Sequence, residues 1–202
     1  FQILSHNYKN EAQILKIKHE NLIHEIRVNL VGKIQLKNIL MAVIAASKSN
    51  LDLKKIFSVI PRLSPVEGRF EKVGKIKNKS LVFLDYAHTP DALQTCILNI
   101  REQFTDKHIS VLFGCGGDRD KGKRSKMGKI ADKYADKIYL TDDNPRHERP
   151  KKIREEINRG IKKRQITEIS NRKEAIVKAI KNLNTGDILI VAGKGHEKIQ
   201  QI

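Results

Sequence analysis

Four polar segments of this chain carry acidic, basic or imidazole side chains, two of them together with glycines, in patterns that could bind an anionic ligand. They read D-Y-A-H-T-P at 85–90, G-C-G-G-D-R-D-K-G-K-R at 114–124, D-D-N-P-R at 142–146 and G-K-G-H-E at 193–197. Glycines let backbone N–H groups converge on an anion, and a guanidinium can hold a carboxylate through two parallel hydrogen bonds. The four segments therefore predict a site for a ligand with phosphate or carboxylate groups.

The first of these segments also has a purely structural interpretation. Thr89 can cap a helix whose first residue is Pro90, a residue that needs no backbone donor at that position. Capping does not account for the ring of Tyr86 or the imidazole of His88, and both side chains suit a flat ring or a phosphate group. A functional role is therefore the preferred interpretation of this segment.

The other segments carry weaker individual signals. Arg119 or Arg124 could hold a carboxylate, but the Walker A pattern G-x-x-x-x-G-K-[ST] occurs nowhere in the chain. Asn144-Pro145 is a common turn pair. Cys115 has no histidine partner implied by its position, so we interpret it as a packing residue rather than a nucleophile. Function is therefore indicated by the segments together rather than by any one of them.

The elements that would position these segments are short buried strands. Helical periodicity separates the strands and predicts helices over 127–135, through Ile153, Ile157 and Ile161, and over 171–183. Alternating strands and helices predict an α/β domain with a mostly parallel sheet, whose ligands bind at the carboxyl ends of the strands. The four segments are therefore expected to converge on one crevice. The apolar runs that predict the strands lie at 81–84, 109–113, 138–141 and 188–192.

The first third of the chain has a different pattern. Alternation of apolar and polar residues predicts paired strands at 12–18 and 22–30, and helical patterns follow at 36–46 and 52–60. Two prolines and a glycine make 61–69 the best candidate linker. We therefore expect two domains, 1–65 and 66–202.

Composition and charge limit the possible functions. The 202 residues include 40 Lys+Arg and 23 Asp+Glu, a net charge of +17, but the excess is spread along the chain and tryptophan is absent. We therefore expect no nucleic-acid partner, although the charge could attract anionic substrates. The longest apolar run, 39–46, is too short to span a bilayer, and two cysteines make neither a disulfide framework nor a zinc site. The sequence predicts a soluble, cytoplasmic protein without a membrane partner.

Taken together, these strings resemble the Mur ligase family, the ATP-dependent amide-forming enzymes of peptidoglycan synthesis. G-R-F-E at 68–71 and the four segments stand in the family's order and at its spacing, and the resemblance covers essentially the whole chain. It implies that 1–65 is the C-terminal part of the central ATP-binding domain and 66–202 a Rossmann-like C-terminal domain. It also implies that the Walker A loop and the catalytic residues lie upstream of Phe1. This chain alone is therefore expected to be inactive, and we expect a monomer.

The resemblance further implies a reaction and its site residues. ATP with Mg²⁺ would phosphorylate a carboxylate of UDP-MurNAc-L-Ala-D-Glu, and an amine of meso-diaminopimelate would attack the acyl phosphate. No catalytic residue and no metal ligand is assigned in this chain. The ATP-binding residues implied by motif are Asn38, Arg69, Asp85 and His88, and the diaminopimelate-binding residues are Arg119, Asp143, Asn144, Pro145, Arg146, Gly193 and Glu197.

The choice of amine follows from the distal end of diaminopimelate, which is zwitterionic, whereas lysine lacks the distal carboxylate. An arginine pair can hold that carboxylate, and Glu197 can pair with the distal ammonium. Lysine-adding relatives differ at the Asn-Pro-Arg turn, so Arg146 favours diaminopimelate. Two alternatives stay open: a lysine-adding sibling, and a basic nucleic-acid-binding or regulatory module of a different class.

Overall fold

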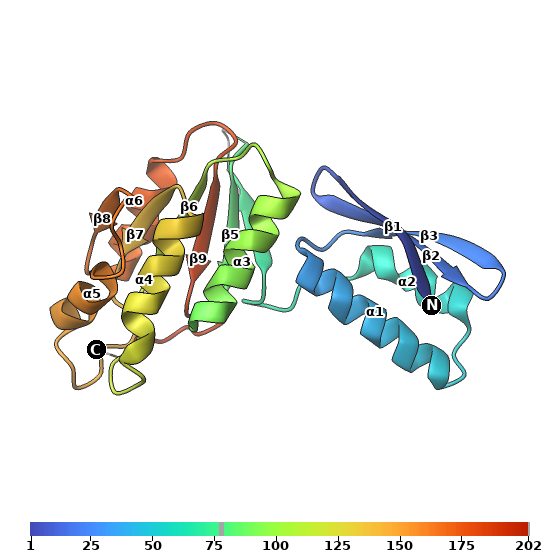
Figure 1. Cartoon of the computed structure of the whole chain (residues 1–202), viewed down its shortest axis with the longest axis horizontal. Coiled ribbons are helices and arrows are strands. Elements are labelled where there is room, and N and C mark those ends of the chain that lie inside the picture. Colours follow the sequence, from blue (N-terminus) through green and yellow to red (C-terminus); the bar gives the residue numbers. More distant parts are fainter. Residues whose placement is uncertain (77–78, 202) are drawn as a thin grey trace. The chain divides into compact units, whose positions relative to one another are not determined.

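The chain, described here by a computed structural model, divides into two compact units, Phe1–Pro65 and Val66–Ile202 (Figure 1). The structure describes residues 1–76 and 79–201. The division falls inside the stretch 61–69, where prolines disfavour regular structure. Each unit has a sheet of its own.

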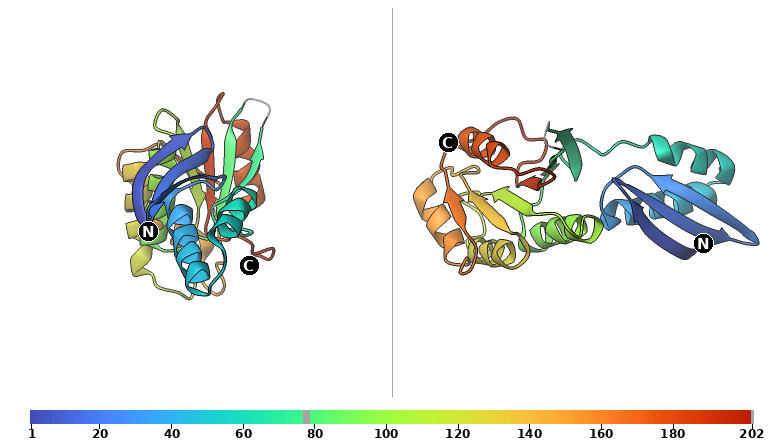
Figure 2. Two further views of the ribbon diagram at one scale, coloured as in Figure 1. Left: turned by 90° about the vertical axis from the view of Figure 1, so that its right-hand side faces the viewer. Right: turned by 90° about the horizontal axis from the view of Figure 1, so that it is seen from above.

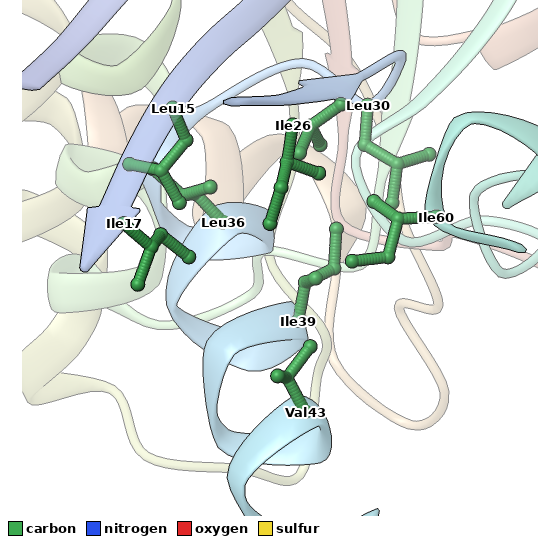
Figure 3. Packing of buried hydrophobic residues seen from close by; sticks show 9 residues of the cluster. Leu15, Ile17, Ile26, Leu30, Leu36, Ile39, Val43 and Ile60 are labelled. Atoms are coloured by element: carbon green, nitrogen blue, oxygen red, sulfur yellow. The ribbon is translucent and has the colours of Figure 1, made fainter. Parts of the chain in front are cut away.

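The first unit is an antiparallel sheet with helices packed on one face. Its strands lie in the order β1-β2-β3, and alternation with period two places Leu15, Ile17 and Ile26 on the face that α1 covers through Leu36 and Ile39 (Figure 3). The Asp52 side chain caps α2 by accepting from the Lys55 N–H. The elements are β1 (Gln2–Lys9), β2 (Ala12–His19), β3 (Leu22–Val28), α1 (Lys33–Lys48), α2 (Leu53–Val59) and the 3₁₀ turn η1 (Ile60–Arg62).

These elements confirm both predicted strands and both predicted helices, but β1 was not predicted. Its register against β2 shifts between Ile3 and Ser5, and most of its residues are exposed. An irregular strand with little burial carries no alternation for a sequence pattern to reveal.

The second unit is a mostly parallel sheet with the strand order β4-β5-β9-β6-β7-β8, in which only the β4–β5 pairing is antiparallel among the described residues. The predicted α/β class and the four predicted strands are confirmed. The edge strands β4 and β8 were missed because one contains a register shift and the other has only three residues. The strands are β4 (Glu71–Lys75), β5 (Leu81–Asp85), β6 (Ile109–Phe113), β7 (Lys137–Leu140), β8 (Ile166–Glu168) and β9 (Ile188–Ala192).

Helices cover both faces of this sheet. The helices α3 and α4 lie on one face and α6 on the other (Figures 1 and 2). Ala175 and Ala179 of α6 pack on Leu112, Leu189 and Val191 of the sheet. The Thr89 hydroxyl caps α3 by accepting from the Ala92 N–H, as predicted. The helices are α3 (Pro90–Gln103), α4 (Gly122–Tyr134), α5 (Pro150–Asn158) and α6 (Arg172–Lys181).

One predicted helical residue lies outside its helix. Ile161 was placed on the stripe of Ile153 and Ile157, but α5 ends at Asn158 and Gly160 follows. A side chain at Gly160 would collide with the carbonyl oxygen of Ser125 on α4, so this close approach requires glycine. Ile161 is nevertheless buried, which explains the apolar spacing that predicted it. In the described part of the chain, no helix has the length and apolar character to cross a bilayer.

Candidate ligand-binding site at the carboxyl ends of the strands

The strand order brings the four polar segments together. The strand β9 enters the sheet last but lies between β5 and β6, so the carboxyl ends of β5, β9, β6 and β7 are consecutive. Hydrogen bonds cross between the segments: Gly193 N–H donates to Asp85 O at 3.1 Å, and Gly117 N–H donates to Asn144 O at 2.8 Å. The predicted convergence is therefore confirmed.

The loop after β6 and the turn after β7 are packed as one piece. A side chain at Gly117 would collide with the carbonyl oxygen of Pro145, so only glycine permits this approach. Arg146 has a left-handed backbone, with φ of 53°, and its Nη1 donates to Gly117 O at 2.8 Å and to Asn144 O at 3.3 Å. The Nη1 group of Arg146 is thus occupied by hydrogen bonds to the protein backbone.

A buried lysine links two of the predicted diaminopimelate contacts. Lys194 and Asn144 are each only 7% exposed. The Lys194 ammonium donates to Asn144 Oδ1 and to Glu197 Oε2, both at 2.9 Å. Asn144 Nδ2 also donates to Glu197 Oε2, at 3.3 Å. The carboxylate of Glu197 is therefore held from two directions by residues at the ends of β7 and β9.

Tyr86 completes the set of donors to Glu197. Its hydroxyl donates to Glu197 Oε1 at 3.1 Å. The bond from Lys194 is the main reason that the pKa of Glu197 lies below its ordinary value, and the bond to Glu197 is the main reason that the pKa of Tyr86 lies above its own. Glu197 is thus ionised at neutral pH, and both of its oxygens accept hydrogen bonds from the protein.

A second buried cation, Arg172, interacts electrostatically with Asp143 and Glu197. Arg172, the first residue of α6, is 7% exposed and donates to the carbonyl oxygen of Ala192 at 2.8 Å. Burial lowers the pKa of its guanidinium, while the charges of Asp143 and Glu197 act in the opposite direction. Arg172 Nη1 is buried without a hydrogen-bond partner among the described residues.

Three of the predicted ATP contacts gather around the ring of Tyr86. The Arg69 guanidinium lies over this ring with Cζ 4.6 Å from the centroid. The His88 ring packs against the Tyr86 ring edge to face, with the two centroids 4.7 Å apart. The Asp85 carboxylate accepts from the backbone N–H groups of Phe70 and Ala87 at 2.7 and 2.8 Å. Asp85 therefore holds the turn that presents Arg69, and burial raises its pKa in spite of these bonds.

The fourth predicted ATP contact lies in the first unit. Asn38 is an exposed residue of α1 and lines a cavity of about 530 Å³ together with apolar residues such as Ile39, Val43 and Leu51.

The two arginines that were predicted to hold a carboxylate have different positions. Arg119 is exposed, and its Nη1 donates to the carbonyl oxygen of Asp118 at 3.1 Å. Arg124 is fully buried and grips Glu148 through both terminal nitrogens, at 2.8 and 2.9 Å. Arg124 thus binds a carboxylate of the protein itself, and its bonds lower the pKa of Glu148 to about 2.

Cys115 is a packing residue, as expected. It is 3% exposed, its sulfur lies 3.6 Å from that of Met127, and burial raises the pKa of its thiol to about 12. Within residues 1–76 and 79–201, no group of three or more His, Cys, Asp or Glu side chains could hold a metal ion.

The chemical character of the site follows from its charges. A cavity of about 450 Å³ is lined by Asn144, Arg146, His196 and Glu197 among others, with Lys194 buried beneath two of these side chains. Carboxylate and guanidinium groups side by side suit a ligand that carries both an ammonium and a carboxylate.

The sequence carried unequal signals for the residues in this site. Tyr86 was recognised as a candidate from its place on the loop, whereas Lys194 and Arg172 were not. Lys194 lies between two glycines directly after a strand, which could have indicated a special role, but Arg172 looks like any charged residue at the start of a helix.

The chain is similar to proteins of known name. The family model described as "Mur ligase, glutamate ligase domain" matches residues 68–195. The chain is 43% identical over 202 residues to the UDP-N-acetylmuramoyl-L-alanyl-D-glutamate–2,6-diaminopimelate ligase of Rickettsia felis, covering 100% of this chain and 37% of that one. It is 49% identical over 180 residues to the ligase of the same name from Rhizobium meliloti, covering 89% and 36%.

A solved structure of a UDP-N-acetylmuramoyl-L-alanyl-D-glutamate–2,6-diaminopimelate ligase is also similar. It aligns with a TM-score of 0.74 and 33% identity, over 99% of this chain and 41% of that one. The chain thus spans roughly two fifths of the length of the relatives it matches.

Proposed function

This chain belongs to the Mur ligase family, and from that premise we propose that it is the amino-acid-binding part of a ligase that adds meso-diaminopimelate to UDP-MurNAc-L-Ala-D-Glu. The observation that carries the proposal is the meeting of Arg146, Asn144 and Glu197 at one cavity. This set offers a guanidinium to the distal carboxylate of the amino acid and a carboxylate to its distal ammonium.

The proposed contacts follow the geometry of the site. Arg146 uses Nη1 for the backbone and offers its remaining donors to the substrate carboxylate, joined by the exposed Arg119. Asn144 lines the cavity, and its neighbours Asp143 and Pro145 after β7 and Gly193 after β9 are proposed as further substrate contacts. Glu197 receives the substrate ammonium.

ATP is the proposed co-substrate. Arg69 is suited to a phosphate group because it lies at the surface beside His88 and Tyr86, and Lys123 adds a cation where its Nζ donates to His88 O at 2.7 Å. Asp85 supports this turn and could reach a ribose hydroxyl through its remaining lone pairs. Asn38 is proposed as an adenine contact. Mg²⁺ binds through few carboxylates and substrate phosphates, so it would arrive with ATP, and none of these roles depends on it.

The experiment that tests the proposal is amine-dependent ADP release by the complete gene product that contains this chain. The assay supplies UDP-MurNAc-L-Ala-D-Glu with meso-diaminopimelate or lysine in parallel. Release with diaminopimelate alone is the expected result. Release with lysine alone would keep the family and overturn the role of Arg146. No release with either amine would overturn the proposed function and favour a regulatory or basic binding module.

We also propose that the protein acts as a monomer in the cytoplasm, where its nucleotide-linked substrate would be made. Sedimentation of the purified chain checks the first point. Binding to nucleic acid through the excess of basic residues would have to fall steeply with salt concentration, and we expect none at physiological salt.

A further inference from the structure

We propose that Lys194 determines which amines the site accepts, because its ammonium already occupies the carboxylate that a substrate ammonium needs. The inference rests on the proposed function and adds a residue to it. Lys194 would discriminate against an amino acid whose distal end is a lone ammonium and in favour of one whose distal end also carries a carboxylate.

The first support is the geometry of Lys194. Its side chain is buried, and its ammonium lies 2.9 Å from both Asn144 Oδ1 and Glu197 Oε2. The backbone on either side is fixed. Gly193 N–H donates to Asp85 O, and Gly195 has φ of 48° and packs so closely that a side chain there would lie 2.7 Å from Gly68 O. Lys194 therefore cannot swing away from Glu197 by a backbone movement of its own.

The second support is the balance of charge around Glu197. Lys194 and Arg172 are buried cations, and Asp143 and Glu197 are the carboxylates that interact with Arg172. Because Arg146 and Lys198 also line the cavity, cations already outnumber these carboxylates. A lone substrate ammonium adds an uncompensated positive charge to this set, and a like charge nearby disfavours it. A zwitterionic end adds no net charge.

The third support is the exchange of partners that a zwitterion permits. When a substrate ammonium also binds Glu197, the hydrogen bond from the Lys194 ammonium to Glu197 is weakened. A substrate carboxylate in the same cavity, beside Arg146, would place a negative charge near Lys194 and offset that loss. Lysine brings no such carboxylate at its distal end, so Lys194 would be left partly unpaired while still buried, which is costly.

The test is the variant Lys194→Met, which removes the charge and keeps a long apolar side chain. KM and kcat for meso-diaminopimelate and for lysine are measured by ADP release in the complete gene product. KM for lysine should fall about tenfold and KM for diaminopimelate should rise about tenfold, within the range by which a pocket separates close analogues. A gain in lysine use is a result that mere loss of structure would not give.

Two further variants control this result. Lys194→Arg keeps the positive charge and should keep the preference for diaminopimelate. Lys173→Met removes a charge from an exposed position on α6 and should leave both KM values unchanged. Should Lys194→Met melt well below the wild type, Lys194→Gln takes its place, since it also removes the charge but retains a donor for Asn144 Oδ1.

The outcomes separate the two proposals. If the wild type prefers diaminopimelate but the neutral variant loses both amines in equal proportion, or its KM for lysine rises, Lys194 is only structural and the inference is wrong. If the wild type releases ADP with neither amine, the proposed function fails and the inference fails with it.

Discussion

Arg124 and Glu148 form a buried ion pair that joins the start of α4 to the segment before α5. Arg124 is 0% exposed, its terminal nitrogens reach both oxygens of Glu148 at 2.8 and 2.9 Å, and a third bond of 2.6 Å runs to Glu156. Glu148 also accepts from the Asp118 N–H at 2.8 Å. The pair therefore fixes the loop that carries Arg119.

Replacement of Glu148 by glutamine should destabilise the chain. The substitution leaves the Arg124 charge buried with Glu156 as its remaining carboxylate, and breaking a buried ion pair costs about 3 kcal/mol. Urea unfolding followed by circular dichroism measures the change in the free energy of unfolding. The matched control is Glu155→Gln, an exposed position on α5, which should change stability by less than about 0.5 kcal/mol. Equal effects of the two substitutions would show that the pair contributes nothing specific.

The same pair predicts a pH dependence of stability. Arg124 lowers the pKa of Glu148 from 4.5 to about 2, so the ionised form stabilises the folded state above pH 4.5. This stabilisation is lost as the pH falls from 4.5 towards 2, where the folded protein also takes up the proton. The difference in the free energy of unfolding between the wild type and Glu148→Gln should therefore be constant between pH 6 and 7, because about one pKa unit above 4.5 suffices for nearly full ionisation. This difference should shrink below pH 4.5. An advantage that does not change with pH would contradict this assignment.

Gly117→Ala should separate the loop after β6 from the turn after β7. A methyl group there meets the Pro145 carbonyl, so the Gly117–Asn144 hydrogen bond cannot form without a backbone shift. We expect a loss of stability of about 2 kcal/mol, in the range for overpacking a crowded position. Faster amide exchange at Gly117 should accompany it. The control is Gly74→Ala on β4, where an added methyl group would have no neighbour within 4 Å.

Arg146→Ala in the complete gene product should chiefly raise KM for diaminopimelate and reduce the preference over lysine. The guanidinium is the group that the proposal assigns to the distal carboxylate, and loss of a charged hydrogen-bond partner costs about 2 kcal/mol, or roughly thirtyfold in KM. Initial rates with both amines measure it. Unchanged discrimination between the amines would remove Arg146 from the proposed contacts.

That experiment needs a control for the backbone, because Arg146 Nη1 also holds Gly117 O and the residue has a left-handed conformation. Arg146→Lys keeps a charge but not the forked donor geometry, and it should raise KM for diaminopimelate less than alanine does. If the two variants lose stability equally and bind alike, the role of Arg146 is limited to the turn.

The sequence by itself determined the class of the fold and the place of the site. Apolar runs such as 109–113 and 188–192 indicate buried strands when they alternate with helical patterns, and the polar segments after these strands had to meet at one edge of a parallel sheet. Short or irregular edge strands such as β1 and β8 escaped because little of their surface is buried and the periodic signal depends on burial.

Only the tertiary structure decided which charged side chains are exposed at the candidate site and which are paired within the protein. Arg119 and Arg124 lie in one segment, yet the first is exposed and the second is buried against Glu148. Lys194 and Arg172 became part of the site because strands and helices far apart in the chain pack around them. The local spacing of residues determines which side chains lie at the end of a strand. The partner of a buried charge comes from another element of the fold, so no local sequence pattern indicates which partner it will have.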